Sequence, residues 1–165
     1  VLGEMDEEIK KKKAKILLDK LPTLIVNPGL IRSLFHNLIN NALKYSKKTI
    51  SPIIRITSEI SNAAGEETKD SQRRYARILV IDNGIGFPQK HAEQIFSIFK
   101  RLHANPEFEG AGIGLAICKK IVEQHRGFIS AKSKEEEGSI FIVSLPMSLN
   151  PDEEKILPER AFSSQ

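Results

Sequence analysis

Two asparagines and a lysine in one predicted helix could bind a metal ion and phosphate. Asn37 and Asn41 are one helical turn apart and share a side of the helix, and Lys44 follows less than a turn later. An amide oxygen suits Mg²⁺ when substrate phosphates supply the other ligands, and a lysine adds a point charge for phosphate. Asn40 is predicted to point away from the core, so only Asn37 and Asn41 could line a cleft. Most helical asparagines simply face solvent or cap a helix, so this segment alone establishes no site.

A second segment could bind the edge of a purine. Asp82 begins the sequence Asp-Asn-Gly-Ile-Gly and follows the apolar run Ile78–Ile81, which is typical of a strand covered on both faces. A carboxylate at the end of such a strand could accept hydrogen bonds from a purine amino group. Gly84 and Gly86 would allow the backbone to approach a ring closely. Taken alone, Asp-Asn-Gly is an ordinary turn signal.

A third segment is rich in glycine and opens a predicted helix. Gly110, Gly112 and Gly114 precede helical periodicity, so backbone amides and the helix dipole could receive phosphate oxygens here. The segment is not a Walker loop, because it lacks the terminal Gly-Lys-Ser/Thr. It is not the dinucleotide Gly-x-Gly-x-x-Gly either, because Ile117 occupies the place of the last glycine. By itself it is a weak signal.

Hydrophobic periodicity predicts the elements that position these segments. Asn27 followed by proline is an N-cap signal, Gly127 is placed like a C-cap glycine, and residues 61–74 are polar enough for a hairpin loop. A short helical piece is expected around Ile95, Phe96 and Phe99. The predicted strands are 14–18, 24–26, 53–60, 75–81, 128–133 and 139–145, and the predicted helices are 28–45 and 112–125.

Composition limits the class of protein. The chain has 165 residues, of which 40% are hydrophobic, so one domain with a real core is expected. The net charge is +4, but the excess comes largely from residues 10–15, where no aromatic residue is interleaved, and this favours a solvated face over nucleic-acid binding. Cys118 is the only cysteine, which excludes an intrachain disulfide and favours a reducing, cytoplasmic setting. No apolar stretch is long enough to span a bilayer, and the start at Val1 predicts a fragment of a longer protein.

Taken together and in this order, these segments resemble the catalytic and ATP-binding domain of sensor histidine kinases. That domain belongs to the superfamily shared with gyrase, Hsp90 and the DNA mismatch-repair ATPases, whose α/β architecture is called the Bergerat fold. Residues 37–46 resemble the N box of the family, residues 82–87 its first glycine box, residues 95–101 its F box and residues 110–116 its second glycine box.

The resemblance runs from about residue 1 to residue 146 and implies a fold. We expect a two-layer α/β sandwich, with a mixed sheet of about five strands, three helices on one face and a mobile ATP lid over roughly residues 87–111. Residues 14–146 would form the domain, residues 1–13 the end of a linker helix and residues 147–165 a polar tail.

The resemblance also implies roles for individual residues. Asn41 would be the Mg²⁺ ligand, Lys44 would meet phosphate, Tyr45 would pack on the adenine, Asp82 would hold its amino group and Arg101 would approach the γ-phosphate from the lid. Simple core packing remains open for Tyr45, and a solvated side chain for Arg101. The expected nucleotide-binding residues are Asn41, Lys44, Tyr45, Asp82, Gly84, Gly86, Phe87, Gly110, Gly112, Gly114 and Leu115, and the expected catalytic residues are Asn37, Lys44 and Arg101.

The residue one turn before Asn41 bears on the reaction. Hydrolytic members of the superfamily carry a glutamate there, whereas this chain has Asn37, whose amide cannot act as a general base. We therefore expect phosphoryl transfer to a histidine on a dimeric helical hairpin outside this chain, with a response regulator downstream. None of the 4 histidines here precedes the motif expected of that acceptor. The chain itself is expected to be monomeric and its parent homodimeric. A nucleotide-sensing module and an ATP hydrolase remain alternatives.

Overall fold

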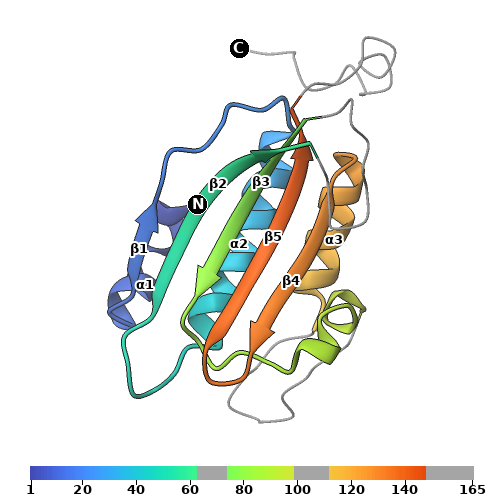
Figure 1. Ribbon diagram of the computed structural model, residues 1–165. Helices are drawn as coiled ribbons and strands as arrows, with labels where there is room; N and C mark the ends of the chain where they lie inside the picture. The colour runs from blue at the N-terminus through green and yellow to red at the C-terminus, as the bar shows by residue number, and fades with distance from the viewer. Residues whose placement is uncertain (63–73, 99–111, 148–165) are drawn as a thin grey trace.

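The computed structural model describes residues 1–62, 74–98 and 112–147, which form a sheet covered by helices on one face (Figure 1). The sheet has five strands in the order β1-β2-β3-β5-β4. β1 pairs with β2 in parallel, and all other pairs are antiparallel. The mixed two-layer α/β sandwich predicted from the sequence is thus confirmed. The strands are β1 (Lys15–Leu18), β2 (Ile53–Ser61), β3 (Tyr75–Asp82), β4 (Phe128–Lys134) and β5 (Gly138–Pro146), and the α-helices are α1 (Asp6–Lys11), α2 (Pro28–Lys44) and α3 (Gly114–Gln124). Short 3₁₀ turns are η1 (Leu2–Met5), η2 (Gln89–His91) and η3 (Gln94–Phe96).

The long helix α2 begins and ends where its sequence signals predict. The Asn27 side chain accepts a hydrogen bond from the Leu30 amide at 3.1 Å, and Pro28 occupies the first turn. The helix ends at Lys44, with Tyr45 as C-cap, one residue earlier than expected. This small difference keeps Lys44 and Tyr45 at the end of the helix that faces the loop after β3.

The hydrophobic core lies between the sheet and the helical layer. The α2 side chains Leu34 and Leu38 are fully buried, as are Ile54 on β2, Val80 on β3 and Val143 on β5. Burial of each such side chain stabilises the fold by about 1.5–3 kcal/mol. The core therefore fixes α2 and α3 on the sheet, and with them the loops that follow the ends of these helices and strands.

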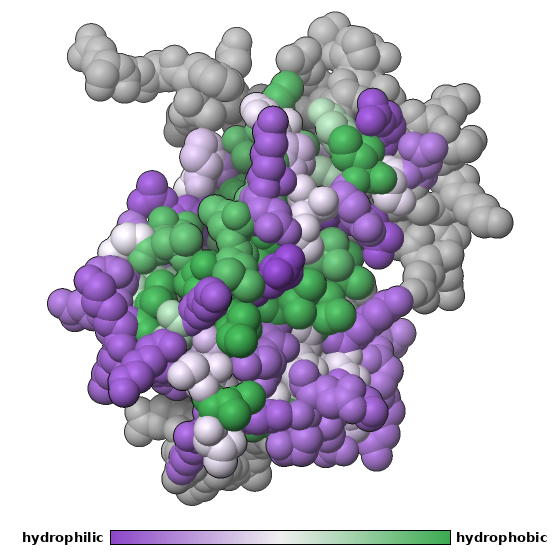
Figure 2. Space-filling view, turned by 60° about the vertical axis from the view of Figure 1, so that its left-hand side comes forward, coloured by the Kyte–Doolittle hydropathy of each residue, from purple (hydrophilic) through white to green (hydrophobic). Residues whose placement is uncertain are grey.

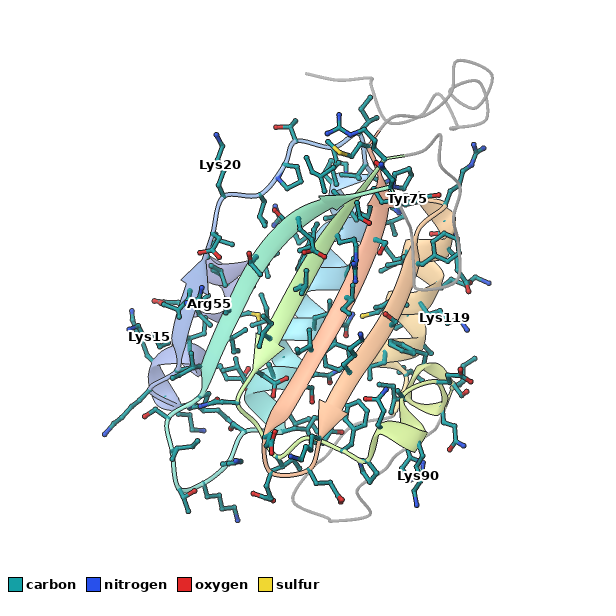
Figure 3. The ribbon with its side chains drawn as sticks, viewed as in Figure 1. Lys15, Lys20, Arg55, Tyr75, Lys90 and Lys119 are labelled. Atoms are coloured by element: carbon teal, nitrogen blue, oxygen red, sulfur yellow. The ribbon has the colours of Figure 1, made fainter. Side chains whose placement is uncertain are left out.

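The opposite face of the sheet is not covered by any helix of the described residues (Figure 1). Figure 2 brings the β1 side of the molecule forward and shows hydrophobic surface in the middle, bordered by hydrophilic side chains. In Figure 3, Lys15 and Arg55 lie on β1 and β2, and Lys119 lies on α3 at the other side. No helix of the described part of the chain is long and apolar enough to cross a membrane.

One predicted strand is wrong. Residues 24–26 form no strand, and the chain from β1 to α2 runs outside the sheet. Leu24 and Val26 pack against the core as single side chains, while Ile25 between them is 64% exposed. Buried and exposed side chains therefore alternate as in a strand. Pro22, just before this segment, has no backbone N–H group to donate to a neighbouring strand.

The start of the second long helix also differs from the prediction. Gly112 has φ +69°, a left-handed conformation that cannot belong to an α-helix, so α3 starts at Gly114. The predicted hairpin of β2 and β3 is confirmed, because Ser61 pairs with Tyr75, and β4 and β5 form a second hairpin in which Lys134 pairs with Gly138. The expected helical piece around Ile95 is a single 3₁₀ turn; its predicted continuation at Phe99 lies outside the described residues.

Candidate nucleotide-binding site

The C-terminal end of α2 is in direct contact with the loop after β3. The Ile85 amide donates a hydrogen bond to the Tyr45 carbonyl oxygen at 2.9 Å. A Cβ atom at Gly84 would lie 2.5 Å from the same oxygen, closer than real Cβ atoms come to other atoms. Glycine at this position thus allows two segments nearly forty residues apart to meet. The asparagine-bearing helix and the Asp-Asn-Gly-Ile-Gly loop form one unit.

Asp82 lies within this unit as the last residue of β3. Its Oδ1 atom accepts a hydrogen bond from the Gly84 amide at 2.8 Å. Burial raises the pKa of the Asp82 carboxyl from 3.8 to about 6, although backbone N–H groups of Gly84 and Ser139 partly offset this by stabilising the charge. At neutral pH the group is mostly ionised, so it can accept a further hydrogen bond from a ligand amino group.

Two further glycines, one in this loop and one at the start of β5, allow the loop to pack on the turn between β4 and β5. Gly86 has φ +63°, and a Cβ atom there would lie 2.1 Å from the Lys134 carbonyl oxygen. Gly138 has φ +106°, and its Cβ would lie 2.0 Å from the Asp82 carbonyl oxygen. The structure therefore gives these glycines a role in packing one loop on the other. The close approach of Gly84 and Gly86 to a purine ring stays a prediction.

Two residues that sequence reasoning missed fix the segment after this loop. The Phe87 amide donates to Ser133 Oγ at 2.9 Å, and that hydroxyl donates in turn to the Gly138 carbonyl at 2.8 Å. The side-chain amide of Gln89 makes two hydrogen bonds to the backbone of β4. Its Nε2 donates to the Ala131 carbonyl at 3.2 Å, and its Oε1 accepts from the Ser133 amide at 2.8 Å. Phe87 itself is 7% exposed. A serine beside a glycine turn was the only sequence signal for this arrangement.

Asn37 lies against the first residue of α3. A Cβ atom at Gly114 would lie 3.0 Å from Asn37 Oδ1, while Asn37 Nδ2 donates to the Ser33 carbonyl at 2.9 Å. The N-cap residue of α3, Ile113, makes no side-chain hydrogen bond to the helix. No cap side chain therefore satisfies the first amides of α3, which are the groups expected to receive phosphate oxygens.

Asn41 offers an amide oxygen that the described protein does not use. Its side chain is half-buried and makes no hydrogen bond within the described residues. Within the same residues no group of three or more His, Cys, Asp and Glu could hold a metal ion. A Mg²⁺ ion here would thus take one amide ligand and depend on nucleotide phosphates for others, which fits the preferences of this hard cation.

Asn40 is less exposed than its position on the helix predicts. It is half-buried like Asn41, because Ile39 and Leu43 are also buried and widen the buried face of α2. Exposure alone therefore does not separate the two asparagines. The choice of Asn41 over Asn40 stays a prediction, which rests on the resemblance of residues 37–46 to the N box of the family.

Lys44 and Tyr45 lie together at the end of α2. The Lys44 ammonium is 4.9 Å from the centroid of the Tyr45 ring, within range of a cation–π interaction. Both side chains are half-buried. The expected contacts of Lys44 with phosphate and of Tyr45 with adenine stay predictions.

The remaining predicted residues lie around α3 or outside the described residues. Leu115 packs partly buried against the core, and Gly112 takes its left-handed conformation just before α3. Arg101 and Gly110 lie outside the described residues, as does the part of the predicted lid from residue 99 to residue 111. In Figure 3, Lys90 marks η2, in the segment that follows the Asp82 loop.

Comparison with known proteins identifies the class. Residues 26–149 match the model of the histidine kinase-, DNA gyrase B- and HSP90-like ATPases. The chain therefore belongs to this family of ATPases.

Within the family the chain is similar to histidine-kinase catalytic domains. The catalytic domain of histidine kinase ThkA superposes with a TM-score of 0.68 at 26% identity, covering 90% of each chain. The mycobacterial sensor histidine kinase MprB superposes with a TM-score of 0.70 at 19% identity, covering 87% of this chain and 91% of the other, and so supports the fold alone. Other similar structures include ThkA with the response regulator TrrA and ShkA with AMPPNP.

The similar sequences are longer proteins. Cyanobacterial phytochrome A of Nostoc sp. is 38% identical over 146 residues, which are 88% of this chain and 18% of that protein. The adaptive-response sensory kinase SasA of Rippkaea orientalis is 32% identical over 154 residues, which are 89% of this chain and 35% of that protein. The chain thus spans about a fifth to a third of the length of these relatives.

Proposed function

We propose that this domain binds Mg·ATP and supplies the kinase half of a two-component sensor histidine kinase. The γ-phosphoryl group would pass to a histidine on a helical hairpin outside this chain, and from there to a response regulator. The observation that carries the proposal is the meeting of three distant segments: Tyr45 contacts the Asp82 loop through the Ile85 amide, and Asn37 contacts Gly114 at the start of α3.

The three segments offer complementary groups. Asp82 would accept a hydrogen bond from the adenine amino group at one end of the site. Asn41 would bind Mg²⁺ in the middle, and the metal would neutralise phosphate charge. The uncapped amides of α3 would receive phosphate oxygens at the other end. The protein's share of catalysis would be positioning and electrostatic stabilisation, with Lys44 and Arg101 as further cations.

The identity of Asn37 favours transfer over hydrolysis. Its amide oxygen lies beside Gly114, close to where phosphate is expected, and an amide cannot take a proton from water near neutral pH. Hydrolysis would lack a general base at this position. A nucleophile brought by a partner protein would need none from this chain.

A phosphotransfer assay tests the proposal. The chain is mixed with Mg²⁺, ATP labelled on the γ-phosphate and a purified cognate hairpin that carries the acceptor histidine. We expect acid-labile label on the hairpin, and none on a hairpin whose histidine is replaced or with the Asn41→Ala variant.

Other outcomes decide between the alternatives. ATP binding without transfer to any hairpin would make the domain a nucleotide-sensing module. Rapid release of ADP from the chain alone would make it a hydrolase and would contradict our interpretation of Asn37.

A further inference from the structure

We propose that Lys12 is a positioning residue for the nucleotide site, which it couples to the N-terminal segment of the chain. The inference rests on the proposed function, because it names a residue that holds the purine end of that site. Lys12 itself lies at the C-cap of α1, on the N-terminal side of the edge strand β1.

The first step is the contact of Lys12 with the end of α2. Lys12 Nζ donates to the Leu43 carbonyl oxygen at 2.6 Å and lies 3.4 Å from Ser46 Oγ, which donates to the same carbonyl at 2.7 Å. The last carbonyls of a helix lack intrahelical partners and attract cations. A partly buried lysine is thus used to hold the last turn of α2, more than thirty residues away in sequence.

The second step leads from this turn to Asp82. Leu43 is fully buried, so its backbone is anchored in the core. The carbonyl oxygen of Tyr45, two residues later, accepts the hydrogen bond from the Ile85 amide. The same oxygen lies so close to Gly84 that a side chain at position 84 would clash with it. A shift of the last turn of α2 would therefore move the loop that carries the Asp82 carboxylate.

The third step is the anchoring of Lys12. Met5 is 3% exposed and packs in the core, so the segment before Lys12 is docked on the domain. α1 then ends in a tight turn in which Lys13 has φ +52° and the Ala14 amide donates to the Ile9 carbonyl at 2.9 Å. A displacement of α1 would be carried to the nucleotide site through the Lys12 side chain.

The chain offers a matched control for charge. Lys12 and Lys13 line the same open hollow of about 1070 Å³, together with Lys44 and the segment between α2 and β2. The Lys13 side chain is exposed and makes no hydrogen bond or ion pair within the described residues. Lys12→Met and Lys13→Met therefore remove the same charge from the same hollow, but only the first removes the bond to Leu43.

Two readouts test the coupling. Calorimetry with Mg·ATP should show about tenfold weaker binding for Lys12→Met, no more than about twofold for Lys13→Met, and recovery to within about threefold for Lys12→Arg, whose guanidinium still donates to a carbonyl. Amide hydrogen exchange without nucleotide should be faster at Ile85 in Lys12→Met than in Lys13→Met. If Lys12→Met does not fold, Ser46→Ala takes its place and should change both readouts in the same direction.

The outcomes separate this inference from the proposed function. Equal affinity and equal exchange at Ile85 in the two lysine variants would overturn the role of Lys12. A lower melting temperature of Lys12→Met with unchanged Mg·ATP affinity would show that Lys12 only stabilises the fold, and this result would also overturn its role as a positioning residue. Failure of the unmodified chain to bind Mg·ATP would instead contradict the proposed function, while exchange at Ile85 would still test whether Lys12 holds this loop.

Discussion

The substitution Asp82→Asn should make the domain more stable and bind ATP less well. Burial raises the pKa of the Asp82 carboxyl from 3.8 to about 6, which corresponds to at most about 3 kcal/mol of destabilisation when the group is ionised in the folded state. Asparagine carries no charge and keeps an oxygen that can accept the Gly84 amide bond. We therefore expect a gain of about 1–3 kcal/mol in the free energy of unfolding at pH 7.5.

The stability difference between Asp82→Asn and the original chain should depend on pH. Above about pH 7 the carboxyl is mostly ionised in both the folded and the unfolded chain, so the folded state bears nearly the full cost of the buried charge. Between about pH 6 and pH 4 the folded state takes up a proton while the unfolded state stays ionised, and the cost disappears. The stability advantage of Asp82→Asn should thus be largest at pH 7 and above and vanish towards pH 4, as measured by urea unfolding.

The same substitution should weaken ATP binding. A hydrogen bond from the adenine amino group to a carboxylate is worth about 1.5–3 kcal/mol, so its loss lowers affinity by about tenfold to a hundredfold. Calorimetry measures the loss, and purine riboside triphosphate, which lacks the amino group, is the control ligand: its affinity should barely change. A variant that loses stability at pH 7.5, or that binds ATP as tightly as the original chain, would refute this role of Asp82.

Other predictions concern the metal ligand, a glycine and the cysteine. Asn41→Ala should lower ATP affinity at least tenfold in the presence of Mg²⁺ and little in its absence, whereas Asn40→Ala should change neither value much; equal losses measured by calorimetry would contradict the choice of asparagine. Gly86→Ala should cost about 2–4 kcal/mol of stability, because its φ is +63° and the new Cβ would clash with the β4–β5 turn at 2.1 Å, while Gly3→Ala, with nothing within 4 Å, should cost little in the same urea experiment. Cys118 is fully buried and burial raises the pKa of its thiol to about 12, so its alkylation at pH 8 should be slow in the folded chain and fast in urea; rapid labelling of the native domain would contradict the packing of α3.

Local signals predicted the helices and most strands well. Asn27 followed by proline predicts the first turn of α2, and the side chain of Asn27 does cap that helix. The continuous apolar run Ile78–Ile81 correctly predicts the strand β3, which pairs with β2 and β5 along both edges, but not its burial on both faces. Ile78 and Val80 are buried in the core, whereas Leu79 and Ile81 on the other face are only half-buried. The failure at residues 24–26 is physical: a strand pattern needs a partner edge, and hydrophobic side chains can be buried from a loop as well.

The contacts that build the site could not be predicted in the same way. Glycine at positions 84 and 86 signals close backbone approach, but not which atoms approach. In the structure these are the carbonyl oxygens of Tyr45 and Lys134, from segments that only the folded sheet brings near. The bond from Lys12 to Leu43 likewise joins residues more than thirty positions apart, and a run of lysines looks the same whether its members are solvated or bound. The order of the motifs along the chain therefore predicted the kind of site, whereas the contacts that hold the site in place depend on tertiary packing.

The most direct test of the central claim is a titration of the domain with Mg²⁺ and a non-hydrolysable ATP analogue, followed by backbone amide NMR. We predict saturable 1:1 binding, with the largest chemical-shift changes at Asn41, Tyr45, Gly84 and Gly114, where α2, the loop after β3 and the start of α3 meet. Changes confined to residues 49–52 in the lysine-lined hollow, or no changes at millimolar nucleotide, would contradict the proposed site.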